Sequence, residues 1–337
     1  MIGTNKATMA DVAKKAGVSL QTVSRVVREH ENVADATRAR VQHAIAELNY
    51  EPNLSAQMLA SGQSRSIGVI TVGDLSYGMQ EIFVSVEAKA RRAGRYVVSA
   101  SAPENDSQAL VGALKYLQAR GVLATVVMAQ NPFIIPVLER ASASQGVLVM
   151  SGRHHLSNYV TIGCDQISGA SDMVRHLLTL SDSIVHIAGP LSAQDAMERL
   201  AAYQQVCAEA GVPARWVSAN GWSAESGYCA GKELNPVPQA IFAASDQIAI
   251  GVARALWERG LEIGRDYYLG GFDDITEAAY LRPSLSTVQQ DFSALAEAII
   301  AALEALIAGK DPEHQEIPTR IIVRESTLRD CVQQGKE

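Results

Sequence analysis

One short segment, residues 18–28 with the sequence VSLQTVSRVVR, constrains this chain more than any other. Its apolar residues recur at helical spacing and predict a helix with one buried face; they are Val23, Val26 and Val27. The opposite face carries polar side chains spaced i, i+4 and i+7: Gln21, Arg25 and Arg28. An amide beside two guanidinium groups is the chemistry that reads base edges in the DNA major groove.

A second short helix is predicted just before this segment. Thr8 can cap its first turn, with Asp11 three residues later at the positive end of the helix. Gly17 breaks the chain between the helices, and Ser19 can cap the second one. Together they predict a helix-turn-helix whose second helix enters the groove. The alternative is a plain helical hairpin inside a larger core.

The charge is distributed unevenly along the chain. Residues 1–66 hold eight Lys/Arg against six Asp/Glu, a balance of +2, so with a total of −7 the rest carries −9. Phosphate binding is therefore expected only in the N-terminal part. A length of 337 residues suits about two or three domains, and 47% hydrophobic residues can supply large cores.

The cysteines are widely scattered, which indicates neither a disulfide framework nor a metal site; they are Cys164, Cys207, Cys229 and Cys331. We interpret them as small apolar residues in or near a core. The N-terminus shows no signal peptide and no stretch is long enough to span a membrane, so we expect a cytoplasmic protein without a membrane partner.

The segment after the predicted helix pair continues the helical pattern. A third helix is expected at about 35–48, although Ala34 before it offers no capping side chain. Residues 53–62 have helical composition but span under three turns, which is marginal for an isolated helix. We therefore expect a DNA-binding head at 1–52 and a hinge helix with linker at 53–65. The alternative for the hinge is a flexible linker.

From residue 66 onward, short apolar runs alternate with helical segments. Strands are predicted at 67–72, 96–100, 123–128 and 147–150, then at 184–188, 215–218, 240–244 and 268–272, with late ones at 285–289 and 317–323. Helices are predicted at 80–93, 106–119, 133–144, 166–179, 196–210, 223–234, 246–259 and 291–308. This alternation predicts two parallel sheets covered on both faces, with ligands bound beyond the carboxyl ends of the strands.

The stretch TMADVAKKAGVSLQTVSRVV, followed by LNYEPN, resembles the start of the lactose-repressor (LacI/GalR) family of bacterial transcription regulators. The resemblance covers nearly the whole chain. It implies an all-α helix-turn-helix head plus an α/β, two-lobed, periplasmic-binding-protein-like body of two doubly wound parallel sheets at 66–337. Three crossovers between the lobes are expected near 162–165, 289–291 and 319–321. Lobe 1 would then comprise about 66–163 and 291–320, and lobe 2 about 164–290 and 321–331.

The same resemblance suggests which residues contact an operator. Leu20, Gln21 and Arg25 are expected at the bases, where apolar Leu20 could contact a thymine methyl group. Leu59 matches a leucine that wedges into the minor groove from paired hinge helices, with Ala56 and Ala60 small enough for close approach. Lys6, Thr22 and Asn32 are expected at phosphates. The complete predicted DNA-binding set is Thr8, Ser19, Leu20, Gln21, Thr22, Ser24, Arg25, Arg28, Asn32, Asn53, Gln57, Leu59 and Ala60.

Polar and aromatic residues at predicted strand ends match the family's effector site. The forked donors of Arg199 suit adjacent hydroxyls, Trp222 offers a flat face for a sugar ring, and Asp273 can accept from hydroxyls. The alternatives are a surface salt bridge of Arg199 with Glu198 or Asp195, and lobe packing for Trp222 and Phe292. Asp246 is expected to cap a helix. The predicted effector set is Ser76, Tyr77, Met79, Ser151, Asp195, Arg199, Trp222, Ser245, Gln247, Asp273, Gln290 and Phe292.

Two positions depart from the family pattern. Ser151 replaces a common aspartate at the end of the fourth strand of lobe 1, and Ser245 replaces the usual amide. These changes leave the ligand open, although the remaining residues look most like a galactoside-type pocket. His154 and His155 follow closely, and we interpret them as part of a solvated loop because adjacent residues of an extended chain point to opposite sides.

These features predict a homodimeric repressor whose affinity for a near-palindromic operator is controlled by a small carbohydrate. A dimer is expected because no leucine-heptad tail follows the last strand. One alternative is a sugar- or nucleobase-responsive regulator that uses its ligand as co-repressor. Another is a ligand-binding protein without DNA-dependent regulation. No catalytic pair, metal spacing or phosphate-binding glycine loop is visible, so no cofactor and no enzymatic activity are predicted.

Overall fold

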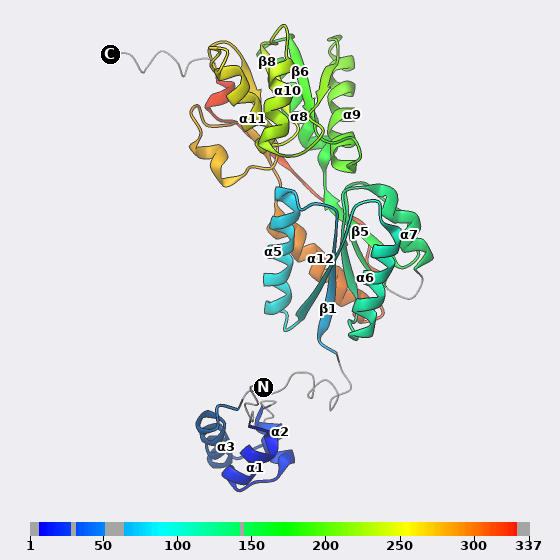
Figure 1. The fold of residues 1–337 in the computed structure, drawn as a ribbon, viewed down its shortest axis with the longest axis vertical. Helices are drawn as coiled ribbons and strands as arrows, with labels where there is room; N and C mark the ends of the chain where they lie inside the picture. The colour runs from blue at the N-terminus through cyan, green and yellow to red at the C-terminus, as the bar shows by residue number, and fades with distance from the viewer. Residues whose placement is uncertain (1–6, 28–31, 51–63, 142–144, 329–337) are drawn as a thin grey trace, which may run out of the picture. The chain divides into compact units, whose positions relative to one another are not determined.

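The computed structural model describes residues 7–27, 32–50, 64–141 and 145–328, which fall into two compact units divided in the sequence between Ser64 and Arg65 (Figure 1). The first unit is the head and the second is the body. The predicted hinge helix at 53–62 lies outside the described residues. So do some of the predicted DNA-binding residues, namely Arg28, Asn53, Gln57, Leu59 and Ala60.

The head consists of α1 (Met9–Ala16), α2 (Leu20–Val27) and α3 (Asp35–Glu47) around a small apolar core. The predicted stripe is confirmed in the part described, since Val23 and Val26 are buried and Val27 is partly buried. Gly17 ends α1 in the left-handed conformation, with φ of 62°, which a glycine adopts without strain. This turn brings α2 back against α1 and α3, so the helix pair is a packed unit.

The helix starts in the head follow the predicted capping pattern. Thr8 and Asp11 form a capping box, in which the Thr8 backbone N–H donates to Asp11 Oδ2 at 2.8 Å. Ser19 Oγ accepts from the backbone N–H of Thr22 at 3.2 Å, as expected of a cap. Ala34, before α3, makes no side-chain capping hydrogen bond, so α3 begins with its first N–H groups unsatisfied by a side chain.

Lobe 1 of the body is a sheet with strand order β11-β5-β4-β3-β1-β2 and parallel neighbours throughout. Its strands are β1 (Ser66–Val72), β2 (Tyr96–Ala102), β3 (Thr125–Met128), β4 (Gly146–Val149), β5 (Tyr159–Cys164) and β11 (Gln315–Ile317). Helices α5 (Tyr77–Arg92) and α12 (Phe292–Ile307) cover one face, and α6 (Ser107–Ala119) and α7 (Ile135–Arg140) cover the other (Figure 1).

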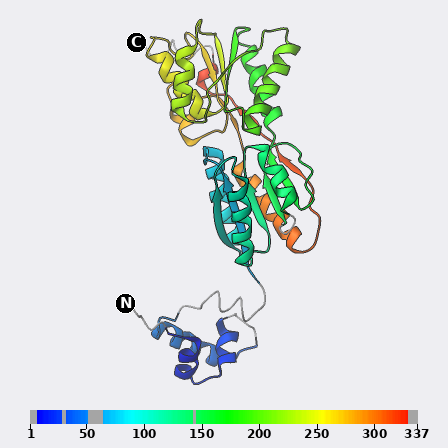
Figure 2. The same cartoon turned by 45° about the vertical axis from the view of Figure 1, so that its right-hand side comes forward.

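Lobe 2 repeats this layered arrangement with a smaller sheet of order β7-β6-β8-β9, again parallel. The strands are β6 (Ile184–Ala188), β7 (Arg215–Ser218), β8 (Ala240–Ala243) and β9 (Tyr268–Gly270). Helices α8 (Gln166–Leu178) and α9 (Gln194–Glu209) pack on one face, while α10 (Ala224–Glu233) and α11 (Asp246–Trp257) pack on the other (Figure 2). No helix of the described chain combines the length and apolarity needed to cross a membrane.

Three predictions about the elements are wrong. Strand β5 was missed, although its sequence YVTIGC is rich in aromatic and β-branched residues. The helix predicted at 133–144 is shorter, comprising a 3-10 turn at Pro132–Ile134 and α7. The strand predicted at 317–323 is two strands, because Pro318 follows β11 and cannot donate to a ladder, and β12 (Arg320–Ile322) then pairs antiparallel with β10 (Thr287–Gln289).

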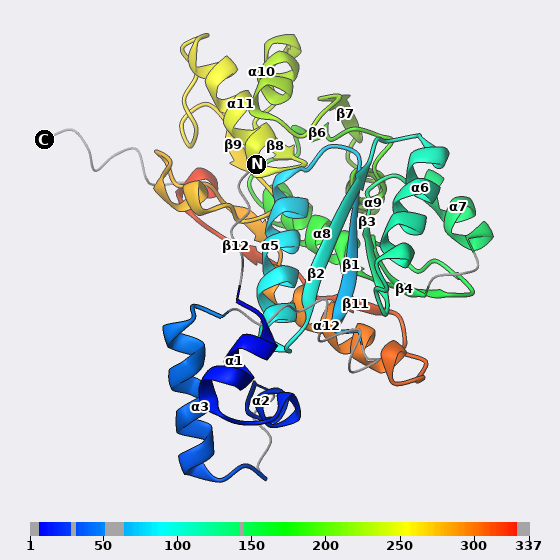
Figure 3. The same cartoon turned by 60° about the horizontal axis from the view of Figure 1, so that its bottom comes forward.

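The chain passes between the lobes at three places, at Asp165, at 290–291 and at 318–319, each of which falls between elements of different lobes. The first and third are joined where Thr319 Oγ1 donates to the carbonyl of Asp165 at 2.9 Å. Helix α8 packs against β12 (Figure 3), and a side chain at Gly169 of α8 would lie 2.3 Å from Thr319 Oγ1. The first and third crossovers are therefore held close together beside α8.

Candidate effector pocket and DNA-contact face

Helix α2 presents the predicted base-contacting residues to solvent. Gln21 and Arg25 are exposed, and Leu20 is 53% exposed although it is apolar. Thr22 and Ser24 are half-buried on the same helix, and Asn32 is exposed in the following loop. Two other predicted contact residues have structural partners: the Thr8 hydroxyl donates to Asp11, and the Ser19 and Thr22 hydroxyls lie 2.9 Å apart. The face that α2 offers is thus an apolar residue beside an amide and a guanidinium.

A small pocket, the inner pocket, lies where the two lobes meet. Its walls come from the start of α5, the end of β3, the first turns of α9 and α11, the loop after β9 and the second crossover. All predicted effector residues except Ser151 line it. Three further lining residues, Gly78, Ile82 and Gln130, escaped prediction, the last because a single glutamine after a strand carries little signal.

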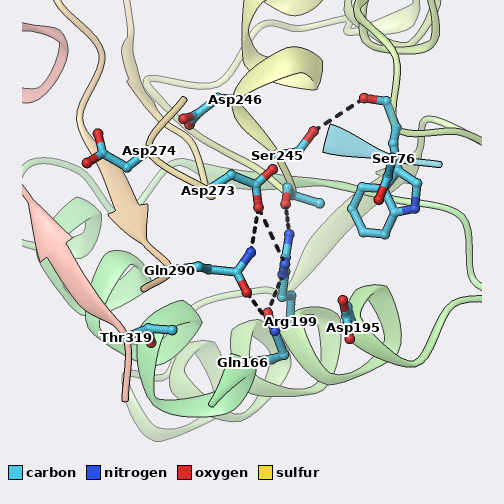
Figure 4. A network of polar contacts seen from close by, with 12 residues as sticks. Ser76, Gln166, Asp195, Arg199, Ser245, Asp246, Asp273, Asp274, Gln290 and Thr319 are labelled. Atoms are coloured by element: carbon cyan, nitrogen blue, oxygen red, sulfur yellow. Dashed lines mark hydrogen bonds and ion pairs between the residues drawn. The ribbon is translucent and has the colours of Figure 1, made fainter. Parts of the chain in front are cut away.

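Arg199 anchors the floor of the inner pocket (Figure 4) and is only 2% exposed. Its Nε donates to Gln166 Oε1 at 2.9 Å, its Nη1 donates to the carbonyl of Ala244, and its Nη2 lies 3.7 Å from Asp273 Oδ1. The guanidinium carbon also lies 3.7 Å from the centre of the Phe272 ring, a cation–π geometry. The alternative of a surface salt bridge with Glu198 or Asp195 is therefore wrong.

Asp273 lies opposite Arg199 in a chain of buried amides. Gln290 Nε2 donates to Asp273 Oδ1 at 2.7 Å, and Gln166 Nε2 donates to Gln290 Oε1 at 3.0 Å. Burial raises the pKa of Asp273 to about 6, while Arg199 and the Gln290 hydrogen bond oppose that rise. Gln166, at the start of α8, was not predicted, and it links Arg199 to the second crossover. The floor is thereby fixed in position before any ligand arrives.

Asp246 does not cap α11, contrary to the prediction. Ser245 is the cap: its backbone is extended and its Oγ accepts from the N–H of Ile248 at 3.2 Å. Asp246 is the first helical residue and is fully buried behind the pocket, where it accepts from Thr287 Oγ1 at 2.6 Å and from the N–H of Ile275 at 2.9 Å. Burial raises the pKa of Asp246 well above its ordinary value.

Ser151 lies beside the inner pocket, where it joins the lobes. Its Oγ donates to Asp195 Oδ1 at 2.7 Å, from the end of β4 in lobe 1 to α9 in lobe 2. The neighbouring backbone N–H of Gln194 donates across the same junction to the carbonyl of Gln130 at 2.7 Å. His154 contacts the carbonyl of Ser151 through Nε2 at 3.1 Å, and among the described residues no cluster of His, Cys, Asp or Glu is arranged to hold a metal ion.

Aromatic side chains form the apolar walls of the inner pocket. Phe292 and Tyr77 meet edge to face with ring centres 6.2 Å apart, and Tyr77 also packs against the core of lobe 2. Burial raises the pKa of Tyr77 to about 12. The Trp222 ring lies against Gly189, and its Nε1 is buried with no hydrogen-bond partner among the described residues. Such an unpaired buried donor is energetically unfavourable.

A head that presents a helix-turn-helix, together with a two-lobed body enclosing a polar and aromatic pocket, defines a ligand-responsive DNA-binding regulator. Residues 8–53 match the family described as "Bacterial regulatory proteins, lacI family", and residues 174–327 match the "Periplasmic binding protein-like domain". The chain belongs to the lacI family of bacterial regulatory proteins.

Similar proteins support this assignment along the whole chain. The lactose operon repressor of Escherichia coli K12 is 31% identical over 326 residues, which cover 95% of this chain and 91% of that protein. The transcriptional repressor PurR of Klebsiella pneumoniae is 30% identical over 330 residues, covering 95% and 96%. Among solved structures, the lac repressor dimer bound to operator and the anti-inducer ONPF superposes with a TM-score of 0.86 at 31% identity, covering 96% and 99%.

Proposed function

We propose that this regulator is a transcriptional repressor that binds a near-palindromic operator as a homodimer, and that a small sugar between the lobes controls its operator affinity. The observation that carries the sugar proposal is the floor of the inner pocket. Arg199, Asp273 and Gln290 supply donors and acceptors at fixed positions, and Trp222 and Phe292 supply apolar faces. This pairing of polar groups with flat apolar surface suits a carbohydrate ring.

The DNA-binding proposal rests on the exposed face of α2. Gln21 and Arg25 can read base edges, and Leu20 can contact a thymine methyl group. The lac repressor structure named above is a dimer on operator DNA, and the regulator CelR was solved with cellobiose at 25% identity and a TM-score of 0.68. By analogy, two heads of this chain would occupy two half-sites.

Control by the ligand follows from the position of the inner pocket. Because its walls come from both lobes, a bound sugar favours the lobe arrangement in which those walls fit it best. It changes operator affinity only by its difference in affinity for the two arrangements. We infer that the protein works in the cytoplasm and binds its sugar without transforming it.

The test begins with selection of operators from random duplexes, followed by fluorescence polarisation at several salt concentrations. We expect a near-palindromic site whose affinity falls steeply with salt. Arg25→Ala should weaken binding by about 1–3 kcal/mol and relax preference at one base pair, whereas Lys115→Ala, an exposed change on α6, should have no effect. No preference for any palindromic duplex would contradict the proposal.

The same assay with added sugars tests the effector. Release of the operator by one sugar supports induction, and tighter binding would show that the ligand acts as co-repressor. Chromatography of the sugars after incubation should recover them unchanged. If no sugar alters operator affinity, the carbohydrate proposal is wrong even though DNA binding stands.

A further inference from the structure

Beside the inner pocket, the two lobes meet at a polar contact, the lobe junction, between the ends of β3 and β4 in lobe 1 and the start of α9 in lobe 2. Two hydrogen bonds cross it. Ser151 Oγ donates to Asp195 Oδ1 at 2.7 Å, and the backbone N–H of Gln194 donates to the carbonyl of Gln130 at 2.7 Å. Separation of the lobes at this point must break both bonds, so each bond reports whether the junction is closed.

Glu198 of α9 brings a carboxylate onto lobe 1 at the lobe junction. A methyl group at Gly152 would lie 2.8 Å from Glu198 Oε1, so the carboxylate lies directly on the Gly152 backbone. Gly152 also has φ of 73°, a left-handed conformation that favours glycine. Gln194 Nε2 holds the carboxylate there by donating to Glu198 Oε1 at 2.8 Å. Glu198 does not line the inner pocket, so the proposed function leaves it without a role.

The surroundings of Glu198 disfavour its ionised form. Asp195 lies one turn earlier on α9, and Glu316 of β11 acts on Glu198 from lobe 1, so both neighbours carry charge of the same sign. Burial raises the pKa of Glu198, and Asp195 and Glu316 add to the rise, while Gln194 and the Ser151 hydroxyl oppose it. Glu198 is therefore protonated more readily in this arrangement than it would be in water.

Two histidines complete the set of titratable groups near the lobe junction. His154 belongs to the loop that Glu198 contacts, and its Nε2 contacts the carbonyl of Ser151 at 3.1 Å. His314 Nε2 lies 3.6 Å from Glu316 Oε1. A protonated His314 would offset the charge of Glu316 and weaken its repulsion of Glu198. Protonation of His314 and protonation of Glu198 therefore act in the same direction.

We propose that the lobe junction is a proton-sensitive latch, in which Glu198 holds a proton while it lies on lobe 1 and releases it when the lobes separate. Separation would expose Glu198 to water and remove it from Glu316, so the closed junction binds the proton more tightly. By linkage, the closed junction is most stable at low pH and weakens as the pH rises from 4.5, the ordinary pKa of the group, through its raised pKa. The latch needs no sugar, and it adds pH as a second input to the lobe arrangement.

Hydrogen exchange of the full-length protein tests the latch at one amide. The Gln194 N–H is protected while it donates to Gln130, so its protection measures closure. Exchange mass spectrometry between pH 4.5 and 7.5, corrected for the intrinsic exchange rate at each pH, should show protection falling about threefold or more. Glu198→Gln is neutral at every pH, so its protection should stay high and constant. Unvarying protection in the parent, or an equal fall in Glu198→Gln, would overturn the latch.

Three further variants identify the group that titrates. Glu233→Gln makes the same chemical change at an exposed site of α10 and should follow the parent. Glu316→Gln removes a like charge, so the fall in protection should move to lower pH. His154→Gln should keep the fall. If His154→Gln loses the fall while Glu198→Gln keeps it, the histidine is the sensor and the inference about Glu198 is wrong.

Discussion

Arg199 and Asp273 bring opposite charges to within 3.7 Å of each other in the interior of lobe 2, from α9 and from the loop that follows β9. Both side chains are buried, so each charge depends on the other and on the surrounding amides for the solvation that water would otherwise supply. The pair also holds the neighbouring amides in place, since Arg199 donates to Gln166 and Asp273 accepts from Gln290.

Removing one partner of this pair should destabilise the protein strongly. Arg199→Met leaves the Asp273 carboxylate buried without its cation and should cost about 3–5 kcal/mol of unfolding free energy. Adding Asp273→Asn to that variant should restore part of the loss. Urea denaturation measures both, with the exposed Arg254→Met as a control of small effect. Strictly additive losses would show that the two charges are independent.

The pH dependence of Asp273 gives a second prediction. Because burial raises its folded pKa from 3.8 to about 6, the folded protein binds this proton more tightly than the unfolded chain does. Its contribution to stability should therefore fall as the pH rises from about 4 to 6 and stay constant above that range. Subtracting the profile of Asp273→Asn isolates the effect, and a flat difference between pH 4 and 6.5 would contradict it.

Ligand binding should follow the same ionisation with the opposite trend. If the Asp273 carboxylate accepts from sugar hydroxyls, affinity for the effector should rise as the pH passes through about 6 and then level off. Calorimetric titrations with a bound sugar between pH 5 and 8 would measure this. In Asp273→Asn the affinity should be lower, and it should lose the step near pH 6; a step of equal size in that variant would assign the titration to another group.

Because Gly189 lies against Trp222, the variant Gly189→Ala should weaken sugar binding while the protein stays folded. A methyl group at position 189 would lie 2.6 Å from the indole ring, so Gly189→Ala must push Trp222 out of place. We expect at least about tenfold weaker sugar binding, a loss of roughly 1.4 kcal/mol, with operator binding retained. Gly112→Ala is the control, since position 112 of α6 is open and the change should leave binding intact.

A missing cap in the head offers a stabilising change. Ala34 occupies the cap position of α3 without a capping side chain, so Ala34→Ser should stabilise the head by about 0.5–1 kcal/mol by accepting from the first turn of α3. Ala39→Ser, on the exposed side within the same helix, should be neutral or slightly destabilising. Differential scanning calorimetry of the full chain would distinguish them, and equal melting curves would show that this cap is not limiting.

The sequence predicts the architecture well wherever periodicity and turn chemistry agree. The buried stripe of α2 and the alternation of strands with helices in both lobes could be read directly from the residues. Strand β5 was harder, because its six residues alternate weakly and end at the first crossover. Pro318 marks the division between β11 and β12 in the sequence, but the change of partner strand from β5 to β10 depends on residues that are distant in the chain.

In the pocket, too, some side-chain contacts could not be predicted from the sequence. Family resemblance supplied Arg199, Asp273 and Gln290, but not the buried Gln166 that fixes two of them. Ser151 was predicted to line the pocket, yet its hydroxyl is directed to Asp195. Ser245 lines the pocket as predicted but also caps α11 in place of Asp246, because its backbone is extended. These contacts join residues that are far apart in the sequence, so only the folded structure reveals them.

Because the chain crosses between the two lobes three times, lobe 1 completes its core only late in synthesis. Leu295, Ile299 and Leu303 of α12 complete the core of lobe 1, yet they follow almost all of lobe 2 in the sequence. The N-terminal end leaves the ribosome first. The head has a core of its own, so it can fold before α12 has been synthesised. Each new chain can therefore complete its helix-turn-helix head before α12 closes the core of lobe 1, so the head folds earlier than the pocket that both lobes form.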